Sequence, residues 1–198
     1  MNEISAFVLA GGKSSRMGTD KAFLKLGGTT LLQRALSLVL AVTNDVFVVG
    51  EKSRLPGIRT VIGDIHSGCG PLAGIHAALS HSPTDLNLLM AVDLPFITES
   101  FLRYLISISQ QSDAVVVIPR SGGRLQPLCA IYRKAFAEPA AQALKQGKYK
   151  IDPLFSQAST RMIEETELAD AGFSCELFKN VNTPADWDEA QRRLSQNV

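Results

Sequence analysis

The sequence of 198 residues lacks the features that mark several large classes of protein. Its three cysteines are far apart, with no CxxC pair and no cysteine–histidine group at the spacing of a zinc site. We therefore expect neither a disulfide framework nor a structural zinc, and we interpret Cys69, Cys129 and Cys175 as free thiols. The formal net charge is only +1, so the strongly basic surface typical of nucleic-acid-binding proteins is not indicated.

Signals for export and for membrane insertion are also missing. Glu3 stands where a signal peptide has basic residues, and the apolar run 6–10 is too short for its hydrophobic segment. No stretch reaches the roughly 20 consecutive apolar residues of a membrane helix. We expect a cytoplasmic protein that has no membrane partner and no nucleic-acid partner.

Two well-known nucleotide-binding motifs are absent, although the first twenty residues are rich in glycine. Gly18 is followed by Thr19 where a Walker A motif requires lysine, and the adjacent Gly11 and Gly12 break the GxGxxG spacing. The second absence argues against a dinucleotide-dependent oxidoreductase. No Ser-His-Asp or Cys-His arrangement is evident, so nothing in the pattern indicates a protein nucleophile.

The arrangement of apolar residues predicts an α/β fold. Hydrophobic residues make up 45% of the chain, enough for one sizeable core, and we expect residues 1–198 to form a single domain. Short apolar runs alternate with stretches of helical periodicity, which predicts a mostly parallel sheet covered on both faces. The segment 120–132 has two extended pieces around a glycine turn, which indicates at least one antiparallel strand. The helix at 135–146 is expected to end at Gly147 unless Pro139 breaks it earlier. The expected strands are 4–9, 45–50, 60–62, 86–92, 114–118, 127–132 and 161–165, and the expected helices are 30–42, 71–79, 98–109, 135–146 and 184–194.

The most informative segment follows the first expected strand and runs from Leu9 to Lys21. It is rich in glycine and serine and carries Lys13 and Arg16 as well as Lys21. Glycine lets a backbone approach phosphate oxygens closely, and the cations neutralise their charge, so this loop suits a polyphosphate. Ligands of open α/β sheets bind at the carboxyl ends of the strands, where this loop is expected. An ordinary connection with solvated lysines is the alternative.

The string LAGGKSSRMGTDK at 9–21 resembles the signature loop of the molybdopterin nucleotidyltransferases. Leu9-Ala10-Gly11-Gly12 is the form that the guanylyltransferases of this family favour, whereas their cytidylyl relatives tend to LAAG. The resemblance continues in order through GPLAG at 70–74, VDLP at 92–95 and NVNTP at 180–184. It spans nearly the whole chain and implies a Rossmann-like three-layer α/β/α nucleotidyltransferase fold. The residues that it implies in nucleotide binding are Leu9, Ala10, Gly11, Gly12, Lys21, Asp64, Gly74 and Asp93.

Asp93 follows an apolar strand, which places its carboxylate at the mouth of a site in a parallel sheet. Mg²⁺ takes one or two carboxylates together with phosphates and waters, although an aspartate at a strand end can also cap the next turn. The resemblance assigns Mg²⁺ binding to Asp93, and Mg²⁺ is the cofactor that we expect. It also places Asp64 near the guanine or ribose and Gly74 near the base. A turn aspartate and a closely packed helix that begins at Pro71 are the structural alternatives.

Polar residues in the last third of the chain extend the expected site. Residues 183–186 form a helix start, with threonine as N-cap and an acid three residues later. That account does not explain Asn180 and Asn182, which the resemblance associates with the pterin substrate. A further polar group flanks the expected hairpin and suits an acidic substrate, with a solvated turn as the alternative. Its members are Arg120, Arg124 and Gln126.

The reaction that the resemblance implies is transfer of GMP from GTP to the terminal phosphate of molybdopterin, with release of pyrophosphate. Such chemistry depends on positioning and charge neutralisation more than on a protein nucleophile. We expect Arg16 to hold the pyrophosphate portion, Lys21 to stabilise charge at the α-phosphate and Asp93 to bind Mg²⁺. GTP and molybdopterin are the expected partners, with transient contacts to molybdenum-insertion proteins or apo-molybdoenzymes. Cytidylyl transfer to molybdopterin or another small phosphate, and a non-catalytic nucleotide-binding accessory protein, are the alternatives.

Overall fold

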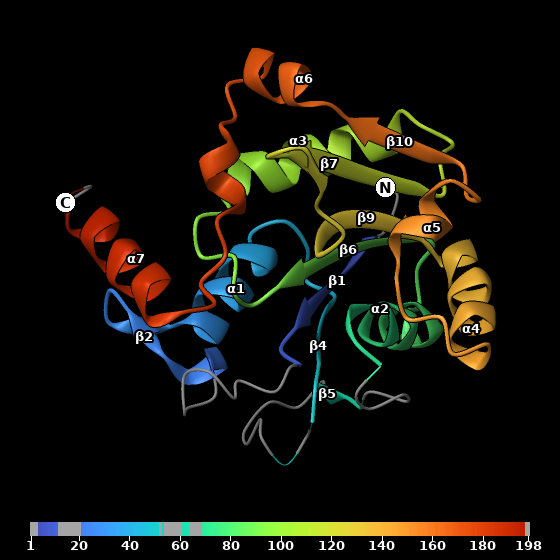
Figure 1. The fold of residues 1–198 in the computed structure, drawn as a ribbon, viewed down its shortest axis with the longest axis horizontal. Coiled ribbons are helices and arrows are strands. Elements are labelled where there is room, and N and C mark those ends of the chain that lie inside the picture. Colours follow the sequence, from blue (N-terminus) through green and yellow to red (C-terminus); the bar gives the residue numbers. More distant parts are fainter. Residues whose placement is uncertain (1–3, 12–20, 52, 54–60, 64–68, 197–198) are drawn as a thin grey trace.

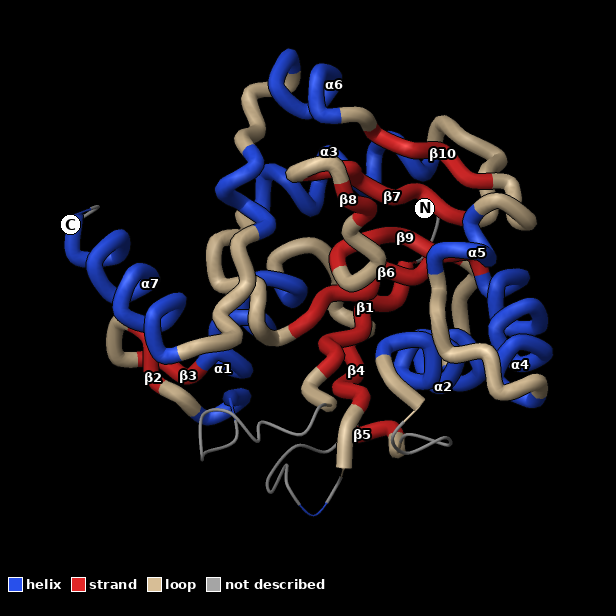
Figure 2. Tube along the Cα trace, in the orientation of Figure 1, coloured by secondary structure: helices blue, strands red, loops and turns tan. Residues whose placement is uncertain are grey.

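The computed structural model describes residues 4–11, 21–51, 53, 61–63 and 69–196, and within these ranges eight strands form the main sheet (Figures 1 and 2). The spatial order is β10 (Thr160–Ile163), β7 (Val116–Ser121), β9 (Cys129–Arg133), β6 (Leu86–Ala91), β1 (Ile4–Leu9), β4 (Val46–Val49) and β5 (Val61–Ile62), with β8 (Arg124–Leu125) beside β7. β9 is antiparallel to both neighbours, β8 is antiparallel to β7, and the other pairs are parallel. The expected mostly parallel sheet with an antiparallel hairpin is confirmed.

The two central strands, β1 and β6, are buried along their whole length. They run parallel and in register, with Leu9 opposite Ala91 at their carboxyl ends. Successive side chains of β1 enter two different hydrophobic clusters, Ala6 a first core and Phe7 a second core on the opposite face. A strand covered on both faces is apolar at every position, which explains why these strands are recognisable as continuous apolar runs.

Helices cover both faces of this sheet, so the fold has three layers (Figure 1). α1 (Leu31–Leu40) and α3 (Glu99–Gln110) contribute side chains to the first core. α2 (Pro71–His81) and α4 (Ala137–Lys145) contribute to the second core. α7 (Pro184–Gln196) joins the first core through Ala190. The layers confirm the expected α/β/α architecture and leave the carboxyl ends of β1 and β6 for the site.

Local signals account for the ends of the long helices. Thr30 begins α1 in a capping box, in which its side chain accepts from the Gln33 N–H and the Gln33 side chain accepts from the Thr30 N–H. Pro139 does not break α4, because it lies in the first turn, where the missing N–H is not needed. Gly147, with φ of 69°, follows the end of α4 as expected.

The sequence pattern misses several of the shortest elements. Two to six residues are too few to show a period, and their conformation depends on the neighbours they meet. The strand expected at 161–165 ends at Ile163, because Glu164 is already the N-cap of the next helix. The unpredicted elements are β2 (Lys25–Leu26), β3 (Thr29–Thr30), α5 (Asp152–Phe155) and α6 (Glu165–Asp170).

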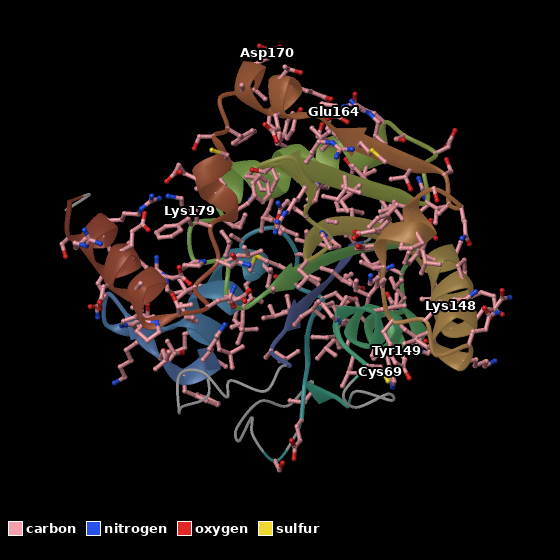
Figure 3. All side chains as sticks on the ribbon, viewed as in Figure 1. Cys69, Lys148, Tyr149, Glu164, Asp170 and Lys179 are labelled. Atoms are coloured by element: carbon pink, nitrogen blue, oxygen red, sulfur yellow. The ribbon has the colours of Figure 1, made fainter. Side chains whose placement is uncertain are left out.

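Cysteines and helix lengths agree with the expectations from composition. The three cysteines are free, and Cys69 lies beside Tyr149 near α4 (Figure 3). Burial raises the pKa of the Cys129 thiol to about 12, so that thiol stays protonated and unreactive. Among the described helices, none combines the length and the apolarity required to cross a bilayer.

Candidate active site

The candidate site lies where β1 and β6 end side by side. The Val92 N–H donates to the Leu9 carbonyl at 3.1 Å, which holds the two chain segments together just beyond the strands. Ala10 and Gly11 continue from β1, and Asp93 continues from β6. In open α/β sheets this edge, outside the carboxyl ends of the strands, is where ligands bind.

Three polar side chains from distant parts of the sequence meet at this edge. Lys21 is the first residue of a 3₁₀ turn at Lys21–Phe23, and its Nζ lies 3.9 Å from Oδ2 of Asp93. The same Nζ donates a hydrogen bond to Oδ1 of Asn182, 161 positions later in the chain. The side chains of Lys21 and Asp93 are 17% and 22% exposed, so the pair is largely shielded from water. The structure thus brings together one residue from each of three motifs.

The environment of Asp93 favours an added cation. Burial raises the pKa of its carboxyl group, and the ammonium of Lys21 opposes that rise. Mg²⁺ needs only one or two protein carboxylates when phosphates and waters complete its shell, so Asp93 fits a Mg²⁺ ion that arrives with a triphosphate. Among the described residues, no group of three or more His, Cys, Asp or Glu side chains is arranged to hold a metal.

The segment 180–183 is fixed against the site from two sides. The Val181 N–H donates to the Asp93 carbonyl at 3.0 Å. Oδ2 of Asp186 accepts from the N–H groups of Asn182 at 2.8 Å and Thr183 at 2.7 Å. These hydrogen bonds are the main reason that the pKa of Asp186 is lowered. Asn180 in the same segment is exposed.

Asp186 is a residue whose importance here is greater than the sequence pattern indicates. The pattern identifies it as the acid of a helix start, and the Asp186 N–H does donate to the expected partner, Thr183 Oγ1, at 3.2 Å. The additional bond to the Asn182 N–H fixes a residue of the site itself. The acid three residues after the threonine is the signal from which this role can be found.

Gly74 lies on α2 and faces Leu9 of β1. A Cβ added at Gly74 would stand 3.7 Å from Leu9 Cδ2, an ordinary van der Waals contact, and Gly74 has no positive φ. Neither packing nor backbone conformation therefore requires glycine at this position. Gly70, by contrast, has φ of 75° at the start of α2, a conformation that favours glycine.

Four residues expected at the site lie outside the described residues. On either side of them, Gly11 and Lys21 bracket the first glycine-rich loop, and Gly63 and Cys69 bracket the second. Their contacts are therefore expectations from the sequence. They are Gly12, Lys13, Arg16 and Asp64.

The polar group at the hairpin has partners within the chain. Arg120 Nε donates to Oε2 of Glu164 at 3.0 Å, and Glu164 lies at the junction of β10 and α6 (Figure 3). The Gln126 amide donates to the carbonyls of Ser121 and Arg124. These contacts fit the alternative of a structural turn. They place neither side chain with the Lys21 cluster, which consists of Lys21, Asp93 and Asn182.

A cavity of about 400 Å³ lies between α1 and the segment 90–99. Its lining includes Arg34, Leu38 and Leu94 and does not include Lys21 or Asp93. The charged side chains of Lys21 and Asp93 thus lie outside this cavity.

Comparison with known proteins shows which family model the sequence matches. The model of a family described as "MobA-like NTP transferase domain" matches residues 6–161, which include the segments with Lys21, Gly74 and Asp93. The matched range ends before Asn180 and Asn182.

Individual relatives align over nearly the whole chain. A probable molybdenum cofactor guanylyltransferase of Pelotomaculum thermopropionicum is 34% identical over 194 residues, which is 96% of this chain and 93% of the relative. A molybdenum cofactor guanylyltransferase of Desulfosudis oleivorans is 29% identical over 98% of this chain and 97% of its own. The solved structure of molybdopterin-guanine dinucleotide biosynthesis protein A from Archaeoglobus fulgidus superposes with a TM-score of 0.84 and 27% identity, over 97% of this chain and 99% of that one.

Proposed function

Because this chain belongs to the MobA-like NTP transferase domain family, we propose that it transfers GMP from GTP to the terminal phosphate of molybdopterin and releases pyrophosphate. Relatives that are similar over nearly the whole chain are named for guanylyl transfer to the molybdenum cofactor. The single structural observation that supports the proposal is the meeting of Lys21, Asp93 and Asn182 at the carboxyl edge of the sheet. An ammonium beside a largely shielded carboxylate suits a polyphosphate that brings a divalent cation.

In the proposed reaction, an oxygen of the terminal phosphate of molybdopterin attacks the α-phosphorus of GTP in line. A new oxygen–phosphorus bond forms, the bond from the α-phosphorus to the bridging oxygen breaks, and pyrophosphate leaves with the electron pair. Lys21 stabilises the negative charge that grows at the α-phosphate, and Arg16 holds the departing pyrophosphate. Both act by position and charge, so the proposal needs no protein nucleophile.

Asp93 is the residue that we propose to hold Mg²⁺. The ion, when bound, neutralises phosphate charge at the reacting centre. The raised pKa of the buried carboxyl supports this role, because a carboxylate that is poorly solvated gains from a second cation beside Lys21.

The two substrates are proposed to occupy the two sides of the Lys21–Asp93 pair. Leu9, Ala10, Gly11 and Gly12, with Asp64 and Gly74, form the nucleotide side. Asn180 and Asn182 form the pterin side, since they precede and follow Val181, whose N–H is bonded to the Asp93 carbonyl. The choice of guanine over cytosine is supported by the LAGG string and by the names of the relatives.

The test measures pyrophosphate release by the purified chain with molybdopterin and Mg²⁺, with GTP and CTP in parallel reactions. We expect release with GTP and none with CTP or without Mg²⁺. Release with CTP alone would retain the mechanism and replace the base. If folded protein and intact pterin gave no pyrophosphate release with either nucleotide, the proposed function would be refuted.

A further inference from the structure

The contact between Lys21 and Asn182 joins the two halves of the proposed site. Under the proposed function, on which this inference rests, Lys21 acts on the nucleotide and Asn182 on the pterin. The structure shows these residues hydrogen-bonded to each other in the protein alone. Asn182, which is assigned to the pterin, therefore contacts the ammonium group of Lys21, which is assigned to the nucleotide.

Asn182 is better fixed than the lysine that it contacts. Its own N–H is held by Asp186 at 2.8 Å, and the preceding residue, Val181, is tied to the Asp93 carbonyl at 3.0 Å. The backbone of Asn182 thus has a set place relative to the Asp93 backbone, which limits where its carboxamide oxygen can lie. A lysine side chain has a flexible four-carbon stem, and its ammonium is readily held by water instead of by protein.

The distances indicate which of these two neighbours orients the ammonium. Lys21 Nζ and Asp93 Oδ2 are 3.9 Å apart, close enough for attraction but too far for a hydrogen bond. Asn182 Oδ1 is within hydrogen-bonding distance of the same Nζ. Asp93 attracts the ammonium, and Asn182 gives it a direction.

We infer that Asn182 is a positioning residue for the nucleotide half of the reaction, which holds the Lys21 ammonium beside Asp93 where the triphosphate arrives. The pterin-side segment 180–183 then sets the charge geometry of the nucleotide side before any pterin binds. Loss of the Asn182 carboxamide weakens nucleotide binding even when the pterin is absent, which a residue that only contacts the pterin does not do.

The experiment measures the Kd of Mg·GTP by calorimetry without pterin for the wild type, Asn182→Ala, Asn180→Ala, Lys21→Ala and the double variant Lys21→Ala/Asn182→Ala. We expect Asn182→Ala to raise the Kd on the order of tenfold, the effect of one hydrogen bond to a charged group. Asn180→Ala, the matched control in the same segment, keeps the wild-type Kd while it loses turnover with pterin. Asn182→Ala adds no further rise in the Lys21→Ala background, because its effect passes through Lys21.

A wild-type Kd in Asn182→Ala, or an equal rise in both asparagine variants, would overturn the inference. Asn182→Ser is the second variant in case the alanine variant does not fold, since a serine side chain is too short to reach the ammonium but preserves a polar loop. It should match the Kd expected for Asn182→Ala, and a wild-type Kd for it would also overturn the inference. If the wild type bound Mg·GTP but did not turn over molybdopterin, the proposed function would be contradicted. The inference about Asn182 would still be tested, because the comparison of Kd values uses no pterin.

Discussion

Two polar regions lie at the same edge of the sheet and use their side chains differently. In the first region, Lys21, Asp93 and Asn182 approach one another at the ends of β1 and β6. The second region is the hairpin β7–β8, whose strand β7 points the same way as β6, because both are antiparallel to β9. A position at the carboxyl edge is therefore shared by both regions and does not by itself make a site.

The difference lies in the partners of the side chains. At the hairpin, the amide of Gln126 is satisfied by backbone carbonyls nearby, and Arg120 is paired with Glu164. Such contacts stabilise a turn and engage the Arg120 charge within the chain. At the first region a partly buried carboxylate with a raised pKa faces an ammonium from another motif. Charges held together against desolvation in this way are typical of functional sites.

The largest effect that this comparison predicts is for Asp93→Ala. We expect turnover to fall on the order of a thousandfold, because the proposed metal ligand is lost, while the fold remains. Asp85→Ala is the matched control, since Asp85 precedes the same strand at its opposite end, is exposed and pairs with Arg133. Steady-state pyrophosphate release and circular dichroism check both variants. Turnover of Asp93→Ala at the level of Asp85→Ala would remove Asp93 from the mechanism.

Lys21→Ala should have the next largest effect. Loss of one preorganised charge at the α-phosphate lowers kcat/KM by at least about a hundredfold. Lys25, an exposed lysine four positions later, provides the control variant Lys25→Ala with no expected change. A loss in Lys21→Ala no greater than that in Lys25→Ala would contradict the assignment of Lys21 to the reacting phosphate.

Asp186→Ala tests the support of the first region and should mainly change stability. Removing a capping carboxylate costs about 1 kcal/mol in the free energy of unfolding. The folded-state pKa of Asp186 lies below the ordinary value of 3.8, so its stabilising contribution is present above pH 3.8 and is lost as the pH falls through the folded pKa. Urea denaturation should therefore separate wild type and variant at neutral pH and bring them together well below pH 3.8. A difference that persists in acid would point to packing instead of charge.

The long elements and the location of the first region could be predicted from the sequence. Buried parallel strands are continuous apolar runs, and Asp93 stands directly after one, so its place at the sheet edge follows from the pattern. The contact of Lys21 with Asn182 could not be predicted in this way. It depends on the path of the chain after β10 and on the Asp186 carboxylate, which fixes the segment 180–183. Neither feature produces a periodic pattern of apolar residues in the sequence.

The polar hairpin shows the converse limit. Arg120, Arg124 and Gln126 have the residue types of an anion site, and their sequence alone cannot distinguish a ligand contact from a structural turn. The distinction rests on Glu164, which is 44 positions from Arg120 and meets it only because β10 pairs with β7. Residue type indicates what a side chain can bind, whereas tertiary pairing decides whether it is already occupied.

Arg120→Ala should have the smallest effect and gives the sharpest test of the comparison. The Arg120–Glu164 pair is a surface ion pair, with side chains 31% and 52% exposed, so its loss should change the free energy of unfolding by about 1 kcal/mol or less. We expect pyrophosphate release to remain at the wild-type rate, because Arg120 is engaged away from the Lys21 cluster. Glu164→Gln, which breaks the same pair from the other side, should behave alike. If Arg120→Ala lost turnover while Glu164→Gln did not, the guanidinium would leave Glu164 for the acidic substrate, and the hairpin would belong to the site after all.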